Sequence, residues 1–224
     1  MAVALAGPPR CYAHAHDPQA RHPHQDPSQK ATAPSSRELI IYQLRIELQG
    51  IAPAIHRTVL VPGTLPLPTL HHVIQAAMGW DDAHLHDFSI GGQRYGEPDP
   101  DFPEMDVLNE RGHTVGEVLG QATQRFTYTY DFGDGWEHAV KVEKRLPAVE
   151  GRNTWPMCIG GQNACPPEDV GGPLGYLDFM EAMASLSHPE HGDMFGWWGG
   201  PFDPCGFSLN EANKAIHRLR TITK

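Results

Sequence analysis

The chain has 224 residues, of which 40% are hydrophobic, so it can form one large domain or two small ones with a core of ordinary size. Its formal net charge of −10 disfavours nucleic acid as a partner, because phosphate binding requires a basic face. No apolar run reaches the roughly eighteen residues of a transmembrane helix, and the apolar start of the chain is too short for a signal peptide. We therefore expect a cytoplasmic protein with no membrane contact.

Residues 1–37 are rich in Pro, Ala, His, Gln and Ser and show no apolar periodicity. A segment of this composition cannot bury enough surface to offset its ordering entropy, so we expect a disordered tail. Four tail histidines could bind a metal as a tract, although a solvated tail is the favoured interpretation. They are His14, His16, His22 and His24. The folded domain is expected to span residues 38–224.

Within this domain, apolar periodicity predicts strands and helices in mixed order. The expected strands are residues 39–48, 55–61, 84–90, 126–130 and 136–144. The expected helices are residues 70–78 after a Thr69 cap, 114–119, 174–187 and 208–219, the last opened by a Ser208–Glu211 capping box. Residues 91–103, 147–173 and 188–206 are expected to be loops. The prediction is a single α+β domain whose mixed, mostly antiparallel sheet of about five strands is covered by about four helices.

The turn between the last two expected strands has the sequence YDFGDGWEH (130–138). Its carboxylates, Asp131 and Asp134, could orient a metal, a water molecule or a cationic ligand. Ordinary turn chemistry is the favoured explanation, since Asp bonds its own backbone and Gly135 accepts the positive φ of a hairpin. Trp136 is a candidate ligand platform but more typical of a core residue.

His138 shares a strand face with apolar residues, which favours a hydrogen-bonded core histidine over a binding residue. Strand parity places Asp131 and His138 on opposite faces, unless a bulge resets one strand. His84 and His86 lie two residues apart on an expected strand, so both could bind one metal. Half-buried edge residues are an equally good interpretation of this pair.

Cys158 and Cys165 lie in a Gly/Pro-rich loop and could share one Zn²⁺, the cofactor that thiols in a cytosolic chain suit best. The remaining ligands would come from Cys205, a histidine or an acid. Glu168 and Asp169 precede an expected helix, where compensation of the helix dipole is the favoured role and ligand binding the alternative.

Four motifs occur together and in one order: IQAAMGWDDAHLH (74–86), YDFGDGWEH (130–138), ACPPEDVGG (164–172) and FDP (202–204). In these motifs the chain resembles the plasmid pRiA4b ORF-3-like family, whose members are often labelled as passenger proteins of mobile elements, some with a resolvase-like label. The resemblance implies an α+β domain, no established reaction, and a binding role for Asp203 in the last motif. Val170 and Cys205 stand where many members have a cysteine and an acid, so a family thiol site would here lose one ligand or use Cys205 instead.

Three functions are consistent with the sequence. The first is a binding or accessory module associated with mobile elements. The second is a metal-dependent, hydrolase-like enzyme that uses His84, His86, Asp131, Asp134 and His138, which would have to surround one pocket. The third is a zinc-stabilised domain that binds a protein partner through exposed aromatic residues, for which Phe195, Trp197 and Trp198 are candidates.

Overall fold

Strong apolar alternation forms the central strands of the sheet. The computed structural model describes residues 39–99, 101, 106–149 and 155–222, so the tail predicted for residues 1–37 lies outside the described part. In β1 (Ile40–Leu48) every second side chain is buried and the others are half-buried, as the predicted pattern requires. The buried set is Tyr42, Leu44, Ile46 and Leu48. β1 pairs antiparallel with β2 (His56–Pro62) on one side and β7 (Trp136–Pro147) on the other.

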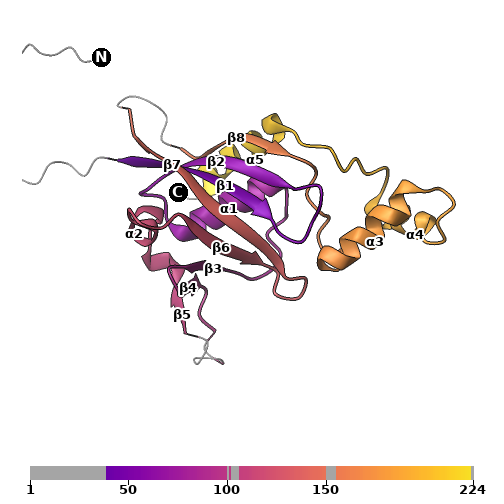
Figure 1. Ribbon diagram of the computed structural model, residues 1–224, viewed down its shortest axis with the longest axis horizontal. Coiled ribbons are helices and arrows are strands. Elements are labelled where there is room, and N and C mark those ends of the chain that lie inside the picture. Colours follow the sequence, from indigo (N-terminus) through magenta and orange to yellow (C-terminus); the bar gives the residue numbers. More distant parts are fainter. Residues whose placement is uncertain (1–38, 100, 102–105, 150–154, 223–224) are drawn as a thin grey trace, which may run out of the picture. The chain divides into compact units, whose positions relative to one another are not determined.

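The eight strands form one mixed sheet in the order β5-β4-β3-β6-β7-β1-β2-β8 (Figure 1). Neighbouring strands are antiparallel except for β4 and β5, which run parallel. The remaining strands are β3 (His86–Ile90), β4 (Gln93–Gly96), β5 (Val107–Asn109), β6 (Arg125–Tyr130) and β8 (Met157–Gln162). The described part also contains the short 3-10 helix η2 (Glu110–Gly112) and the helices α1 (Leu67–Met78), α2 (Val115–Leu119), α3 (Gly172–Ala184), α4 (His191–Trp198) and α5 (Leu209–Ile222).

The α+β class is confirmed, but the predicted element counts are wrong: the described residues hold eight strands and five α-helices. Three of the missing elements, β4, β8 and α4, lie in the expected loops, and β5 lies in the unassigned stretch between residue 103 and the helix expected at residue 114. The cap predicted for α1 is also wrong, because this helix begins at Leu67 after Pro66 and Thr69 is buried inside it. Proline fits the first helical turn, where its missing N–H has no partner to lose. The predicted stop is correct, since Gly79 ends the helix at φ +102°.

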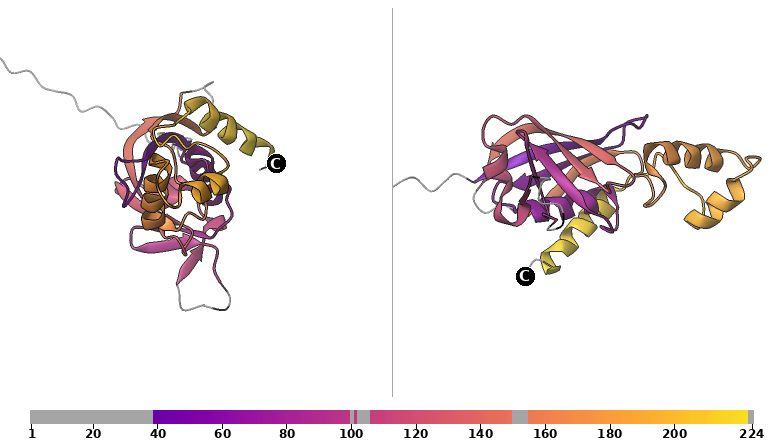
Figure 2. Two further views of the ribbon diagram at one scale, coloured as in Figure 1. Left: turned by 90° about the vertical axis from the view of Figure 1, so that its right-hand side faces the viewer. Right: turned by 90° about the horizontal axis from the view of Figure 1, so that it is seen from below.

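Helix α1 supplies the layer that covers the sheet, and α5 packs beside it (Figures 1 and 2). Leu67, Leu70 and Ile74 on α1 are almost fully buried in the same core cluster as the apolar face of β1. Asn213 on α5 receives a hydrogen bond from the backbone N–H of Cys158 at 2.9 Å and donates one to its carbonyl at 2.8 Å. These bonds hold α5 against β8. None of the described helices has the length and apolarity that crossing a membrane requires.

The β6–β7 hairpin brings Tyr130 opposite Trp136, and both rings are fully buried. Its turn closes with a hydrogen bond from Gly135 N to the Asp131 carbonyl at 2.6 Å. Gly135 has φ +69°, which confirms the positive φ predicted for this position, and Asp131 itself has φ +53°. The carboxylate-rich turn therefore has a defined, unusual backbone that only a few residue types adopt at low cost.

Replacing Gly135 with valine should destabilise the domain by about 1–3 kcal/mol, because a β-branched residue is strained at positive φ. No described atom lies within 4 Å of a Cβ built at this position, so the cost arises from the backbone and not from a clash. The midpoint of urea unfolding measures it. A midpoint equal to that of the parent protein would show that the turn tolerates a side chain in this conformation.

Candidate functional site

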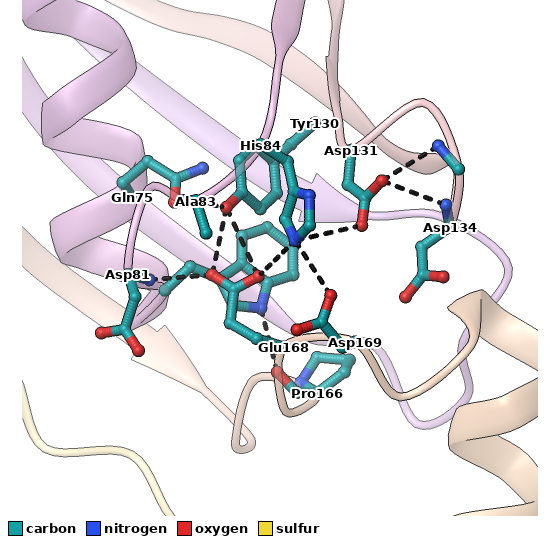
Figure 3. A network of polar contacts seen from close by, with 12 residues as sticks. Gln75, Asp81, Ala83, His84, Tyr130, Asp131, Asp134, Pro166, Glu168 and Asp169 are labelled. Carbon is teal, nitrogen blue, oxygen red and sulfur yellow. Dashed lines mark hydrogen bonds and ion pairs between the residues drawn. The ribbon is translucent and has the colours of Figure 1, made fainter.

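One histidine and three carboxylates converge where the β6–β7 hairpin meets the segment that leads into α3 (Figure 3). The Nε2 atom of His84 lies 3.0 Å from Asp169 Oδ1, 3.6 Å from Asp131 Oδ2 and 3.8 Å from Glu168 Oε2. For His84, Asp131 and Asp169, the potential ligand atoms all lie within 4.8 Å of one another. We call these four residues the His84 cluster.

Asp131 enters the cluster because it directly follows β6 and has a left-handed backbone conformation, with φ +53°. Its Oδ1 atom accepts hydrogen bonds from Gly133 N at 2.9 Å and from Asp134 N at 3.3 Å (Figure 3). These turn bonds fix the carboxylate and leave Oδ2 directed at His84. The side chain is only 11% exposed. In Asp131, Oδ1 thus makes the hydrogen bonds of the turn, and Oδ2 is the candidate ligand atom.

Glu168 is held in the same way by a different set of donors. Its Oε1 atom accepts from Asp81 N at 2.8 Å and from the Tyr130 hydroxyl at 3.1 Å, while Oε2 faces His84 and lies 3.4 Å from the same hydroxyl. The Tyr130 hydroxyl in turn accepts from Ala83 N at 2.9 Å. Burial raises the pKa of Tyr130, so its hydroxyl stays protonated as a donor. The segment after α1, the strand β6 and the Pro-rich loop are therefore tied together at Glu168.

Asp169 completes the cluster on its open side. Its φ is +57° and its side chain is 70% exposed. The next residues fix the loop against the hairpin, because Gly171 N donates to Asp134 Oδ2 at 3.1 Å. Asp134 thus acts on the loop backbone, and it does not belong to the group whose ligand atoms lie around His84 Nε2. One face of the cluster is open to solvent and the other is closed by protein.

The electrostatics of the cluster favour a cation. His84 Nε2 is buried and makes no hydrogen bond of good geometry within the described residues, although three carboxylate oxygens surround it. Three carboxylates carry a charge of −3, and a protonated imidazole would offset only one unit. A divalent cation between them would offset two and would give the imidazole nitrogen a partner. Imidazole and carboxylate are ligands that transition metals and Mn²⁺ accept.

Two other predicted binding residues belong to the core. Trp136 is 1% exposed. His138 is fully buried, and its Nδ1 atom lies 3.1 Å from the Trp136 carbonyl and 3.3 Å from the Tyr128 carbonyl. Because carbonyls only accept, Nδ1 carries the proton and Nε2 is the bare nitrogen. Burial lowers the pKa of His138 to about 4. Their burial therefore supports the interpretation of Trp136 and His138 as core residues.

His84 and His86 do not face one common ligand set. His86 bonds through Nε2 to Glu110 Oε2 at 3.0 Å, and its ring stacks on that of His71 with centroids 3.5 Å apart and planes 2° apart. Burial and the neighbouring His86 lower the pKa of His71 to about 3, although Asp82 opposes the shift, so this ring is neutral at pH 7. The predicted strand at residues 84–90 begins only at His86, so His84 precedes β3 and the strand spacing that suggested one shared metal does not apply. The two histidines contact separate polar groups.

The three described cysteines are not gathered into a ligand set. No group of three His, Cys, Asp or Glu ligand atoms within 4.8 Å of one another includes a thiol of a described residue. Cys158 is buried on β8 with its Sγ donating to the Gly160 carbonyl, while Cys205 is exposed. Burial raises the pKa of Cys165, which disfavours the thiolate that a metal requires. Asp203 accepts a hydrogen bond from Cys205 N at 3.0 Å and caps that turn.

The aromatic residues predicted to contact a protein partner lie on α4. Phe195, Trp197 and Trp198 are 41%, 51% and 43% exposed. Several residues of the candidate His84 cluster stand out in the sequence, but the residues that position them do not. Tyr130 and Trp80 are the missed residues: Trp80 donates from its indole N–H to the Pro166 carbonyl at 3.0 Å. In the sequence, Tyr130 and Trp80 are marked only as aromatic residues that stand beside a carboxylate motif.

Sheet, helices and cluster together define an α+β domain with a histidine–carboxylate site at the end of its β6–β7 hairpin. The family model described as "Plasmid pRiA4b ORF-3-like protein" matches residues 40–211. The chain therefore belongs to the plasmid pRiA4b ORF-3-like family, which confirms the resemblance found in its motifs.

Two relatives illustrate the family. The uncharacterized protein y4hQ of Sinorhizobium fredii is 38% identical over 180 residues, which cover 80% of this chain and 92% of that protein. The crystal structure of MM3350 from Methanosarcina mazei Go1, a protein of unknown function, has a TM-score of 0.70 and 34% sequence identity, and the match covers 77% of this chain and 97% of that one. The fold is thus shared, and the function has to be argued from the site.

Proposed function

We propose that this protein is a binding module that holds one divalent metal cation in the His84 cluster. One observation carries the proposal: protein donors hold Asp131 through Oδ1 and Glu168 mainly through Oε1, and the second oxygen of each carboxylate is directed at His84 Nε2. Metal ligands are commonly oriented by such outer hydrogen bonds. An ordinary ion pair does not need two carboxylates to be fixed in this way around one imidazole.

The donor set indicates which cations to test. Carboxylate oxygens suit Mg²⁺ and Mn²⁺, whereas imidazole suits Zn²⁺ and other transition metals. A site with one imidazole and three carboxylates fits Mn²⁺ well, because Mn²⁺ accepts both kinds of ligand. Mn²⁺ is also convenient to measure, since the electron paramagnetic resonance signal of the free ion is lost on binding.

Replacing Glu168 with glutamine should weaken Mn²⁺ binding at least about 100-fold, because the variant loses a charged ligand while keeping its shape. The matched control is Glu211→Gln, the same change at an exposed residue of α5 that pairs with Lys214 at 2.8 Å. The control should bind Mn²⁺ as the parent does. Both variants are made in the full chain with His14, His16, His22 and His24 changed to serine, so that the tail histidines do not contribute.

Equal Mn²⁺ affinity in Glu168→Gln and its parent would contradict the proposal. So would a parent that binds no Mn²⁺, Zn²⁺ or Mg²⁺ at millimolar concentration. In either case the His84 cluster would be an ion-pair network between the hairpin and the loop, with a structural role only.

A metal-dependent hydrolase is the second candidate, and the exposure of Asp169 favours it. Because this ligand is 70% exposed, a cation in the cluster would keep coordination positions for water. Mn²⁺-dependent cleavage of an aryl phosphate or ester, lost in Glu168→Gln, is the expected result for an enzyme.

The plasmid reading frame in the family's description supports a role as an accessory module of a mobile element.

A further inference from the structure

A second polar group lies where α1 packs against the segment that follows it, and it lines the same cavity as His84. His71 and His72 are neighbours on α1, and both contact Asp82, which lies beyond the end of that helix. His71 Nε2 is 2.5 Å from Asp82 Oδ1, and His72 Nδ1 is 3.0 Å from Asp82 Oδ2. The potential ligand atoms of the three residues lie within 4.8 Å of one another.

We propose that His71, His72 and Asp82 form a second metal site, independent of the His84 cluster, which binds Zn²⁺ or Co²⁺ and keeps open coordination positions. Two imidazoles and one carboxylate are a common ligand set for these borderline metals. A set with two nitrogens and one oxygen favours Zn²⁺ over Mg²⁺ or Ca²⁺, which require mostly oxygen. The two sites are thus expected to differ in metal preference.

The surroundings of His71 provide the outer hydrogen bonds that such a ligand needs. Its Nδ1 atom lies 2.8 Å from the Tyr128 hydroxyl, which also accepts from Gln75 Nε2 at 2.9 Å. Without metal, Gln75 Nε2 donates to the Tyr128 hydroxyl, Tyr128 donates to His71 Nδ1, and His71 Nε2 donates to Asp82. With Nε2 bound to a metal, His71 must instead donate from Nδ1 to Tyr128.

Gln75 can accept the proton that this reversal moves. Its Oε1 atom is buried and has no hydrogen-bond partner within the described residues, and the residue is 3% exposed. If the amide turns over, Tyr128 donates its hydroxyl proton to Oε1, and Nε2 gives up its bond to that hydroxyl. The buried, unpaired oxygen therefore has a partner in the metal-bound arrangement that it lacks in the metal-free one.

The backbone at Asp82 gives independent support. Five described residues other than glycine have positive φ: Asp82, Asp106, Asp131, Asn163 and Asp169. Asp82 has φ +61°, and three of the five are carboxylates of the two clusters. Backbone strain of this kind persists where the surrounding structure requires it, and it is concentrated at functional sites.

The proposed site opens into a cavity, so the three residues need not complete the coordination sphere. His71, His72 and Asp82 line a cavity of about 480 Å³ together with His86, Glu110 and Arg94. Asp82 is 36% exposed and His72 39%, so both ligands are reachable from solvent. A metal with three protein ligands in such a cavity would bind water or a small anion in its remaining positions.

The test is a Co²⁺ titration followed by visible absorption, with the full chain in which the four tail histidines are serine. We expect two bound equivalents in the parent. Asp82→Asn should remove the Co²⁺ of the proposed second site and keep that of the His84 cluster. Glu168→Gln should do the reverse. Asparagine tolerates the left-handed backbone of Asp82, so this variant should keep its fold. His72→Gln is a second variant at a half-exposed position, and the exposed His217→Gln is the control for both.

Two unchanged equivalents in Asp82→Asn and His72→Gln, with native circular dichroism, would overturn the proposal. Loss of one equivalent in both variants, with that equivalent retained in Glu168→Gln, would support the proposal, even if the His84 cluster bound no Co²⁺. In the parent protein, addition of azide should shift the visible bands of the Co²⁺ bound by His71, His72 and Asp82. Bands that do not respond to azide would show a closed site and would contradict the open positions.

Discussion

Gly172→Ala should destabilise the domain by roughly 2–4 kcal/mol and also weaken Mn²⁺ binding. A Cβ at Gly172 would lie 2.4 Å from the carbonyl oxygen of Asp134, and the residue has φ +69°. Backbone cannot yield as a flexible side chain does, so the loop must move away from the hairpin. That movement would separate Glu168 and Asp169 from Asp131, and the cluster would lose its geometry.

The neighbouring glycine supplies the matched control. Gly171 also has positive φ, at +92°, but a Cβ there would meet only Gly175 Cα at 3.6 Å, which is an ordinary contact. Gly171→Ala should therefore cost about 1 kcal/mol, through backbone strain alone. Urea unfolding measures both variants. If the two lose equal stability and equal Mn²⁺ affinity, the close approach of loop and hairpin does not hold the cluster together.

Acid should destabilise the protein between pH 6.5 and pH 4, and His138 should account for a large part of the loss. Burial lowers the pKa of His138 from 6.5 to about 4. In this interval the unfolded chain binds a proton that the folded protein does not, so stability falls as the pH falls. The shift corresponds to roughly 3 kcal/mol, which is fully retained above pH 6.5 and lost on reaching pH 4.

The measurement is the free energy of unfolding at several pH values for the parent protein and His138→Asn. Asparagine keeps an N–H donor for the Trp136 and Tyr128 carbonyls but does not titrate, so the variant should be less stable at pH 7 and less sensitive to acid. The exposed His217→Asn should leave the pH dependence unchanged. A parent and a His138→Asn variant with parallel profiles would show that another group dominates the acid response.

Strands with strong alternation were predictable from sequence, and weak or short ones were not. In β1, apolar side chains recur at every second position, which only a half-buried strand explains. β8 contains Gly160 and Gly161 and lies at the edge of the sheet, so its pairing with β2 comes from tertiary contacts and not from propensity. β4 has four residues and β5 three, too few for any period to be visible.

The site was predictable residue by residue but not as an arrangement. The carboxylates Asp131, Glu168 and Asp169 and the imidazole of His84 stand out in the sequence, yet nothing local joins them. Their convergence depends on contacts such as that between Tyr130 and Glu168, which are 38 residues apart. His71 and His72 were missed for the opposite reason: their helix is apolar around them, so two histidines there looked like part of the covering layer.

Anomalous diffraction from crystals grown with Mn²⁺ would show whether a cation binds in the His84 cluster. We expect an anomalous peak bound by His84 Nε2, Asp131 Oδ2 and Glu168 Oε2, at metal–ligand distances of about 2.0–2.3 Å. The peak should be absent from crystals of Glu168→Gln grown under the same conditions. Crystals soaked in millimolar Mn²⁺ with no peak among these residues, and with His84 still paired to Asp169, would contradict it.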